Sequence, residues 1–327
     1  MLTFGLALVV GLAAVPGTRL VLVRAGVLDV PNQRSSHRQA VPRGGGVAVG
    51  IAATSALMVT SWGVAAAALA SAAVALGAVG AVDDVRGVAV RTRLAVQFLV
   101  PVAAVPFLVH DADAALPLVV LFGVSVVWCA AYVNAFNFMD GINGIAAAQA
   151  VIAGLACAVL GAWHDDTLLV AGGLAIAGAM LGFVPFNFPT ARLFLGDVGS
   201  YFAGAWLALL PVLAIRSGVP AEVAAAPFAV FVADTGTTLV RRWRRGQRLS
   251  VAHREHAYQQ LVDLGWSHAT VTGVFAVLSS AIVAVMLAVD GEAAAVRAGG
   301  VLVAATLAAG FVLLPRYVGH RVLVPAG

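Results

Sequence analysis

Acidic, amide and histidine side chains gather in four short motifs of this chain. The motifs are DDVRG (Asp83 to Gly87), NAFNFMDGING (Asn134 to Gly144), FLGDVGS (Phe194 to Ser200) and HREHAYQ (His253 to Gln259). Carboxylates and amides offer oxygen ligands to hard cations, and histidines donate and accept protons. The stretches between the motifs are apolar and long enough to cross a bilayer, where unpaired ionisable groups are costly. The motifs therefore predict a functional site at a membrane boundary.

Asp83 and Asp84 are adjacent carboxylates at the end of an apolar run. Because like charges repel, the pair favours a bound cation, an arginine partner or a shared proton. Structural pairing with Arg86 is the alternative. Asp197 opens another apolar run, where the N–H groups of a helix start attract phosphate and a carboxylate can hold a hard cation. A plain N-cap is the alternative for Asp197.

Asn134, Asn137, Asp140 and Asn143 recur every three residues. On a helix this spacing gives a polar stripe that drifts slowly around one side. Such a stripe faces a wet cavity that holds substrate, or it makes a polar contact with another helix.

His253 and His256 are three residues apart, which predicts that they share a helical face. With Arg254 they favour a cationic cradle for phosphate, because a zinc site would need a third Cys or His ligand nearby. Arg38 and Arg43 lie in the first polar connection, beside Gly44-Gly45-Gly46. A glycine-rich backbone next to arginine suits phosphate, and a simple turn explains the glycines equally well.

The whole composition is that of an integral membrane protein. Of 327 residues, 61% are hydrophobic and 10% are charged, and the mean hydropathy is +0.99, which excludes an ordinary soluble domain. All 19 basic residues are arginines, and the net charge of +4 fits a positive-inside bias better than binding to nucleic acid. Cys129 and Cys157 lie in apolar stretches and are expected to be small buried hydrophobes.

Hydropathy predicts an all-α, polytopic transmembrane bundle of about eleven spans, with ten as the alternative, in a single domain over residues 1–327. Arginines gather in the odd-numbered connections and acidic residues in the even-numbered ones. The positive-inside rule then places the N-terminus outside and the C-terminus, with all four motifs, on the cytoplasmic side. The predicted spans are 2–23, 45–62, 64–82, 94–109, 116–134, 144–161, 167–184, 198–214, 222–240, 266–289 and 298–315.

The order and wording of the motifs resemble those of one enzyme family. RSSH, PRGGG, DDVRG, NAFNFMDGINGIA, FLGDVGS, ADTGTTLVRR and HREHAYQ follow one another from about Leu28 to Gln260. Together they resemble the polyprenyl-phosphate N-acetylhexosamine-1-phosphate transferases, the superfamily of WecA and MraY, and most closely its WbpL-type branch. The resemblance implies a bacterial cytoplasmic-membrane enzyme whose active site faces the cytoplasm.

The resemblance also implies the reaction and its participants. Polyprenyl (undecaprenyl) phosphate attacks the sugar-linked phosphorus of a UDP-N-acetylhexosamine, which gives polyprenyl-diphospho-sugar and UMP and initiates an O-antigen-like or other cell-wall glycan. The expected cofactor is Mg²⁺, with Mn²⁺ as the alternative, and a homodimer is left open. The chemistry fits the residues independently, because two anionic phosphates can meet only beside a cation and cationic side chains.

The family's functional positions can be matched one by one to this sequence. Asn143 stands where many relatives carry Asp, so only hydrogen bonding is expected of it. The resemblance assigns the lipid phosphate to Asp83 and Asp84, magnesium to Asp197, metal, phosphate or nucleotide contacts to Asn137 and Asp140, the uridine pocket to Asn187 and Phe194, and closure over the diphosphate and sugar to His253, Arg254 and His256.

A transporter or channel is the competing class. Its polar residues would line a path across the bilayer and interrupt helices near the midplane. Here the spans 45–62, 64–80 and 267–289 contain no acid or base, and the polar groups cluster at one boundary. A CDP-alcohol phosphotransferase is a third class, but its repeated-Asp helix signature is absent from the sequence.

Overall fold

Long apolar runs fold into helices because lipid offers no hydrogen-bond partners and a helix satisfies its own backbone groups. The computed structural model describes residues 1–30, 40–109, 117–248, 251 and 253–323. A short 3-10 helix, η1 (Ala226–Phe228), separates α9 from α10, and two short strands, β1 (Leu28–Asp29) and β2 (Val41–Pro42), pair in antiparallel fashion. The α-helices are α1 (Leu2–Arg24), α2 (Gly46–Thr60), α3 (Val64–Arg86), α4 (Val90–Val109), α5 (Leu118–Met139), α6 (Ile145–Trp163), α7 (Thr167–Asn187), α8 (Gly196–Arg216), α9 (Ala221–Ala225), α10 (Ala229–Arg244), α11 (Ala257–Asp263), α12 (His268–Ala288) and α13 (Ala294–Leu323).

The predicted all-α membrane bundle is confirmed. Within the described residues, ten segments are long and apolar enough to cross a bilayer, with α9, η1 and α10 counted together as one. The remaining predicted span is α2, which has 15 residues. A helix of that length reaches about 22 Å, which is less than the hydrocarbon core of about 30 Å. Each of the eleven predicted spans thus corresponds to a helical segment, and α2 is the short one.

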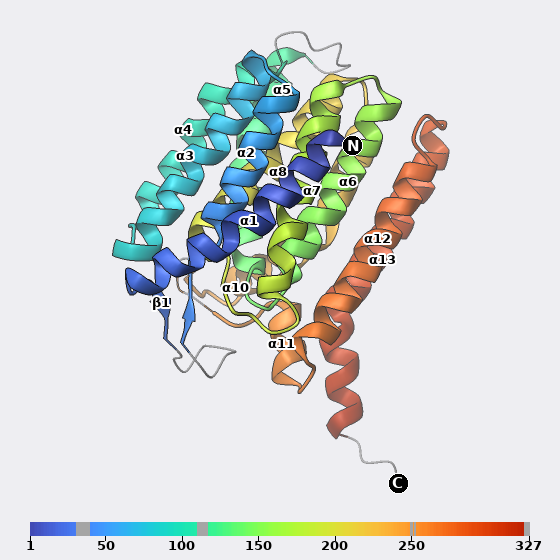
Figure 1. The fold of residues 1–327 in the computed structure, drawn as a ribbon. Helices are drawn as coiled ribbons and strands as arrows, with labels where there is room; N and C mark the ends of the chain where they lie inside the picture. The colour runs from blue at the N-terminus through green and yellow to red at the C-terminus, as the bar shows by residue number, and fades with distance from the viewer. Residues whose placement is uncertain (31–39, 110–116, 249–250, 252, 324–327) are drawn as a thin grey trace.

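Helix α8 forms the centre of the bundle. Most of its span is buried, and α2, α3, α5, α6 and α7 pack around it (Figure 1). Small residues permit the closest approaches in lipid. A Cβ atom on Gly46 would lie 2.0 Å from the Cα atom of Gly199, and one on Gly80 would lie 2.1 Å from the carbonyl oxygen of Asp197. These glycines allow α2 and α3 to pack directly against the first turn of α8.

The polar motifs lie at one end of the bundle. Helices α3 and α5 end there and α8 begins there, with β1 and α11 at the same end (Figure 1). The N-terminus of α1 lies toward the opposite end, and α13 extends past the motif end (Figure 1). Residues that are far apart in the sequence therefore meet at this end. Its assignment to the cytoplasm stays a prediction.

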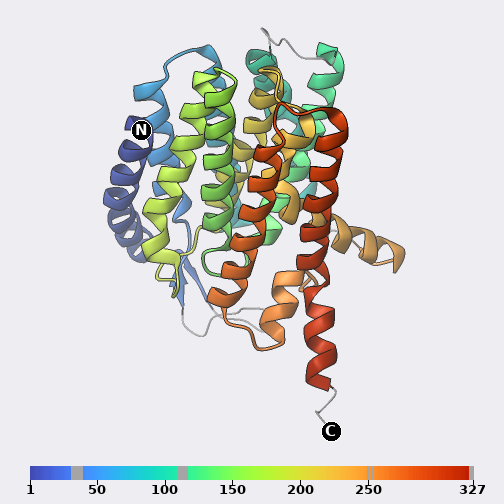
Figure 2. The same ribbon diagram turned by 90° about the vertical axis from the view of Figure 1, so that its right-hand side faces the viewer.

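Helix α10 leans away from the bundle at the motif end. Figure 2 shows its gold ribbon projecting sideways, with α13 running beside it. The change of direction follows η1, which contains Pro227. Proline lacks a backbone N–H group and clashes with the preceding turn, so it interrupts an α-helix. The α12–α13 hairpin then packs against α6, α10 and α11.

Candidate active site

A carboxylate from α3 holds the start of α8. Asp84 accepts the backbone N–H groups of Asp197 and Val198, each at 3.0 Å, and its nearly buried side chain also pairs with Arg43. The free N–H groups of a helix start need such a partner. Asp197 itself lies in the first turn of α8, and the N-cap position belongs to Leu195, without a side-chain cap. The N-cap interpretation of Asp197 is therefore wrong.

The neighbouring carboxylate, Asp83, belongs to a different cluster. Arg93 Nη1 of α4 donates to Asp83 Oδ2 at 2.7 Å, and the Tyr201 hydroxyl of α8 lies 3.4 Å from the same oxygen. Arg93 also donates to the Tyr201 hydroxyl at 3.2 Å. The pairing of the two acids with Arg86 is wrong, because each has an arginine partner from another segment.

Asp197 faces an amide and a guanidinium. Asn137 of α5 donates from Nδ2 to Asp197 Oδ1 at 3.0 Å and to Ser200 Oγ at 2.8 Å. Arg43 Nη2 lies 3.6 Å from Asp197 Oδ2. Burial lowers the pKa of Arg43, but the negative charges of Asp84 and Asp197 raise it above its ordinary value. The guanidinium therefore stays charged between two carboxylates that come from different helices.

Asp140 carries a perturbed carboxyl group at the end of α5. It occupies the C-cap position, one residue beyond the span. Burial raises its pKa from 3.8 to about 7, and the charges of Asp197 and Asp84 act in the same direction, against the opposing effect of Arg43. The same end thus has more negative charge than its arginine offsets, which is a feature of sites that bind cations. The polar stripe expected on one helix stops here, because Asn143 lies in the turn beyond α5.

His253 and His256 lie in the segment before α11, not on a shared helical face. Backbone bonds from Asp234 explain this difference: its carboxylate accepts from the Ala257 N–H group at 2.9 and 3.1 Å and lies 3.2 Å from His256 Nδ1. The two imidazole rings are still neighbours, with centroids 5.0 Å apart. Burial and the positive charges of His256 and Arg242 lower the pKa of His253 to about 4. His253 is therefore neutral at pH 7, unlike the cationic cradle expected.

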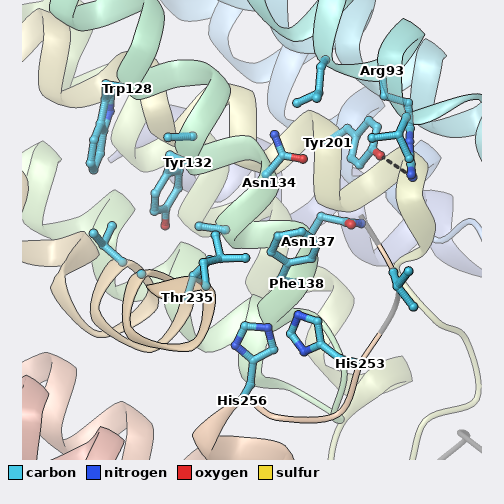
Figure 3. Close-up of a pocket in the computed structure, with 18 of the residues that line it drawn as sticks. Arg93, Trp128, Tyr132, Asn134, Asn137, Phe138, Tyr201, Thr235, His253 and His256 are labelled. Carbon is cyan, nitrogen blue, oxygen red and sulfur yellow. Dashed lines mark hydrogen bonds between the residues drawn. The ribbon is translucent and has the colours of Figure 1, made fainter. Parts of the chain in front are cut away.

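A cavity of about 760 Å³ adjoins these groups between α4, α5, α8 and α10. Figure 3 shows Arg93, Asn137, Tyr201 and the two histidines along its polar side, and Trp128 and Tyr132 farther along α5. Most of the remaining lining is apolar. The cavity therefore joins a charged mouth to an apolar groove, which suits an amphiphile with an anionic head.

Comparison with known proteins connects this geometry to an enzyme family. The sequence pattern described as "Glycosyl transferase family 4" matches residues 47–215, which run from α2 to α8 and include both halves of the Asp84–α8 contact. The chain belongs to glycosyl transferase family 4. It is a membrane transferase of the WecA and MraY superfamily and not a transporter, as the resemblance of its motifs implied.

Characterised relatives in this superfamily align with most of the chain. A Bacillus subtilis protein named as a probable undecaprenyl-phosphate N-acetylglucosaminyl 1-phosphate transferase is 27% identical, over 82% of this chain and 78% of its own. The decaprenyl-phosphate N-acetylglucosaminephosphotransferase of Mycolicibacterium smegmatis is 29% identical, over 76% and 72%. A phospho-N-acetylmuramoyl-pentapeptide-transferase of Leuconostoc citreum is 29% identical over 47% of each chain.

The structure brings some of the expected family 4 residues together and places others apart. Asp83, Asp84, Arg43, Asn137 and Asp197 form one connected cluster. Other expected residues either line the cavity or make local bonds away from it, and Arg38 lies outside the described residues. Asn134 lines the cavity and donates to Gln97, Asn187 bonds Gly144 N–H and the Leu193 carbonyl, Asn143 donates to the Pro189 carbonyl, Arg254 pairs with Asp263, and Phe194 bridges Arg43 through its backbone.

The glycine-rich loop pairs with protein and not with open space. Gly44 and Gly45 donate their N–H groups to the Phe194 carbonyl, at 3.1 and 2.8 Å, and Gly46 donates to the Leu195 carbonyl at 2.9 Å. The turn interpretation of these glycines thus fits better than a phosphate loop, because their donors are already used. The loop instead positions the side chain of Arg43 between Asp84 and Asp197.

Sequence reasoning missed three polar residues of this family 4 site. Arg93, Tyr201 and Ser200 contact Asp83 or Asn137 directly. Arg93 was counted only as a topological charge, although an arginine at the start of an apolar span adjoining DDVRG was a usable signal. Tyr201 and Ser200 follow FLGDVG, and their contacts depend on how α8 packs against α4 and α5, which the sequence does not specify.

Proposed function

We propose that the chain transfers N-acetylhexosamine 1-phosphate from a UDP-sugar to polyprenyl phosphate. The products are polyprenyl-diphospho-sugar and UMP, and the reaction initiates a cell-envelope glycan. The observation that carries the proposal is the continuity of a charged mouth with an apolar groove. An isoprenoid chain fits along the Trp128 and Leu94 side, while its phosphate reaches Arg93, Tyr201 and Asn137. A soluble acceptor would gain nothing from such a groove.

Asp83 is better placed than Asp84 to act on the lipid phosphate. Both oxygens of Asp84 already accept backbone N–H groups of α8 and one pairs with Arg43, so Asp84 positions the site. Asp83 instead touches Arg93 and Tyr201, which line the cavity. In the proposed reaction, Asp83 accepts a proton from the lipid phosphate, whose oxygen bonds to the sugar-linked phosphorus. The bond from that phosphorus to the bridging oxygen breaks, and UMP leaves with that oxygen.

The nucleotide side of the site faces the loop before α11. His253 lines the cavity beside His256 and is neutral at pH 7, so it can donate or accept a hydrogen bond at the diphosphate. Arg43 supplies positive charge near Asp197, where the transferred phosphate must pass. In this proposal the arginines offset the repulsion between the two anionic substrates, and the histidines orient the donor.

The residues at the motif end fit a magnesium ion shared with substrate. Asp197, Asp140 and the amide oxygen of Asn137 offer oxygen donors, and the raised pKa of Asp140 reports excess negative charge that a cation would relieve. No group of three or more His, Cys, Asp or Glu within the described chain forms a complete site. Magnesium often uses one or two carboxylates plus substrate phosphates. When bound, Mg²⁺ or Mn²⁺ would neutralise charge developing on the phosphate oxygens.

The setting of the reaction follows from charge and hydropathy. We place the motif end at the cytoplasmic face of a bacterial inner membrane, because the arginine-rich connections lie at that end. UDP-sugars then reach the site from the cytoplasm and the lipid acceptor reaches it from the bilayer. The chain acts as one domain, and the proposed reaction needs only residues of one chain, whether or not it forms a homodimer.

The test is an assay of the purified protein with undecaprenyl phosphate and a panel of UDP-N-acetylhexosamines. UDP-N-acetylglucosamine leads the panel, because the names of two similar proteins contain that sugar. The proposal expects magnesium-dependent release of UMP with one sugar, only when the lipid acceptor is present. UMP release that is unchanged without the acceptor would contradict it, as would the absence of release with every sugar.

A further inference from the structure

A second groove lies on the side of α10 that faces α13. Its volume is about 730 Å³, and its walls include Val232, Val240, Val312 and Leu313. It is separate from the polar cluster around Asp84, although both grooves touch α10. Figure 2 shows the projecting end of α10 beside α13, where a lipid in the bilayer could enter from the side.

Arginines dominate the polar rim of this groove. Arg241, Arg244, Arg245 and Arg316 line it, and its lining contains no acidic residue. Two of these charges are already engaged: Arg241 donates to the Glu255 carbonyl at 2.8 Å, and Arg245 Nη1 lies 3.7 Å from the Glu255 carboxylate. Among the described residues, no hydrogen bond or ion pair holds the side chains of Arg244 and Arg316. These two guanidinium groups therefore have positive charge to offer a ligand.

The groove is arranged along the bilayer normal in the way that a phospholipid is. The arginines lie at the motif ends of the two spans, where arginine-rich segments meet headgroups. Val232 lies roughly 13 Å along the helix from Arg241, on the hydrocarbon side. A free phosphate would use only the arginines and leave the apolar walls uncovered. A neutral lipid would cover the walls and leave the charges of Arg244 and Arg316 unpaired.

We propose that this groove is a binding site for an anionic phospholipid. Its headgroup phosphate pairs with Arg244 and Arg316, and an acyl chain lies along the valines and Leu313 between α10 and α13. Charge complementarity selects the anionic headgroup, and apolar contact selects a lipid over a soluble anion. Binding at this site does not depend on the transferase reaction proposed above.

The groove also connects to the segment that carries the two histidines. Arg241 lines the groove and holds the Glu255 carbonyl, and Glu255 lies between His253 and His256 in the sequence. The Glu255 carboxylate pairs in turn with Arg242. A phospholipid in the groove therefore steadies the end of α10 from which this segment leaves. We expect turnover to be higher in vesicles that contain the anionic lipid, a consequence that rests on the proposed function.

The test measures lipid retention without substrate, by native mass spectrometry of protein exchanged into mixed micelles of phosphatidylglycerol and phosphatidylcholine. The wild type should retain phosphatidylglycerol preferentially. Arg244→Gln with Arg316→Gln should weaken retention about fivefold per arginine, since each arginine near an anionic lipid contributes about that much. Arg24→Gln with Arg91→Gln is the matched control, because these exposed arginines have the same charge and lie at the same end.

A variant that keeps every charge separates groove binding from general attraction. Val312→Trp fills the apolar wall and should reduce retention of phosphatidylglycerol, while its melting temperature reports whether the protein is folded. Equal retention by the wild type, the double arginine variant and Val312→Trp would overturn the proposal. Equal losses in the Arg244/Arg316 and Arg24/Arg91 variants would also overturn it, because only overall charge would then matter. Preferred retention of polyprenyl phosphate over phosphatidylglycerol at this groove would overturn it as well.

Discussion

At the scale of single residues, the two adjacent aspartates of α3 do different work. Asp84 points at the start of α8 and Asp83 points toward the lipid groove, although they are neighbours in sequence. Successive side chains on a helix are separated by about 100° of rotation, so adjacent acids meet different partners. The sequence showed that both were unusual, but their separate roles depend on which helices pack on each side.

Asp84→Asn should reduce stability more than Asp83→Asn. The amide keeps one acceptor oxygen, so it loses one of two backbone bonds to α8 as well as the ion pair with Arg43. Loss of a helix cap costs about 1 kcal/mol, and the effect should appear as a lower melting temperature in detergent. Asp83→Asn should lose turnover with a smaller change in melting temperature. Equal melting temperatures and equal turnover in the two variants would contradict the division of roles.

Asp197→Asn should lose most activity and leave stability nearly unchanged. Its carboxylate does not cap α8; it accepts from Asn137 and faces Arg43, both of which tolerate an amide. Removing its charge weakens magnesium and phosphate handling, for which a loss of about a hundredfold is expected. Magnesium-dependent UMP release and the melting temperature should be measured together. Full activity at ordinary magnesium concentrations would exclude Asp197 from the metal site.

Asp140 should give the metal-free protein a distinctive dependence on pH. Its pKa is raised from 3.8 to about 7 by burial and by neighbouring carboxylates. The folded protein therefore holds a proton that the unfolded chain releases, so the contribution of Asp140 to stability falls as pH rises from about 4 to about 7. Asp140→Asn removes that loss. Its melting temperature relative to wild type should rise across this window, and a constant difference at every pH would refute the interpretation.

At the scale of elements, the spans follow from hydropathy but the breaks in them do not. The apolar runs specify each helix because lipid leaves the backbone no other partner. The first turn of α8, the sideways lean of α10 and the extended segment at His253 all depend on tertiary partners. Asp84 supplies the partner for α8, and the buried carboxylate of Asp234 supplies it for His256 and Ala257. A three-residue spacing could not distinguish that segment from a helix.

The groove between α4, α5 and α10 should discriminate acceptors by chain length. Ala131 lines it on the lipid-facing side of α5, so Ala131→Trp narrows the path of an isoprenoid chain without touching a polar group. We expect a KM for undecaprenyl phosphate raised about tenfold, which corresponds to the loss of a few buried methylene groups. The KM for the UDP-sugar should not change. Kinetics with a short-chain acceptor provide the control, and an unchanged KM for the long acceptor would place the lipid elsewhere.

At the scale of the whole molecule, the sequence predicted which residues gather but not how they are divided. Hydropathy placed the four motifs at one end, and the structure brings Asp83, Asp84, Asn137 and Asp197 together there. Asn187 and Asn143 also reach that end, yet their amides bond backbone groups of turns. The difference arises because polarity shows that a residue needs a partner, whereas packing decides whether the partner is protein or substrate.

The central claim is that phosphate moves together with the sugar. The most direct measurement uses a UDP-N-acetylhexosamine labelled at its sugar-linked phosphorus, with undecaprenyl phosphate and the purified wild-type protein. The account predicts that the label appears in the lipid product and that one UMP is released for each lipid-linked sugar formed. Release of UDP, with the label left on the nucleotide and only the sugar on the lipid, would contradict it.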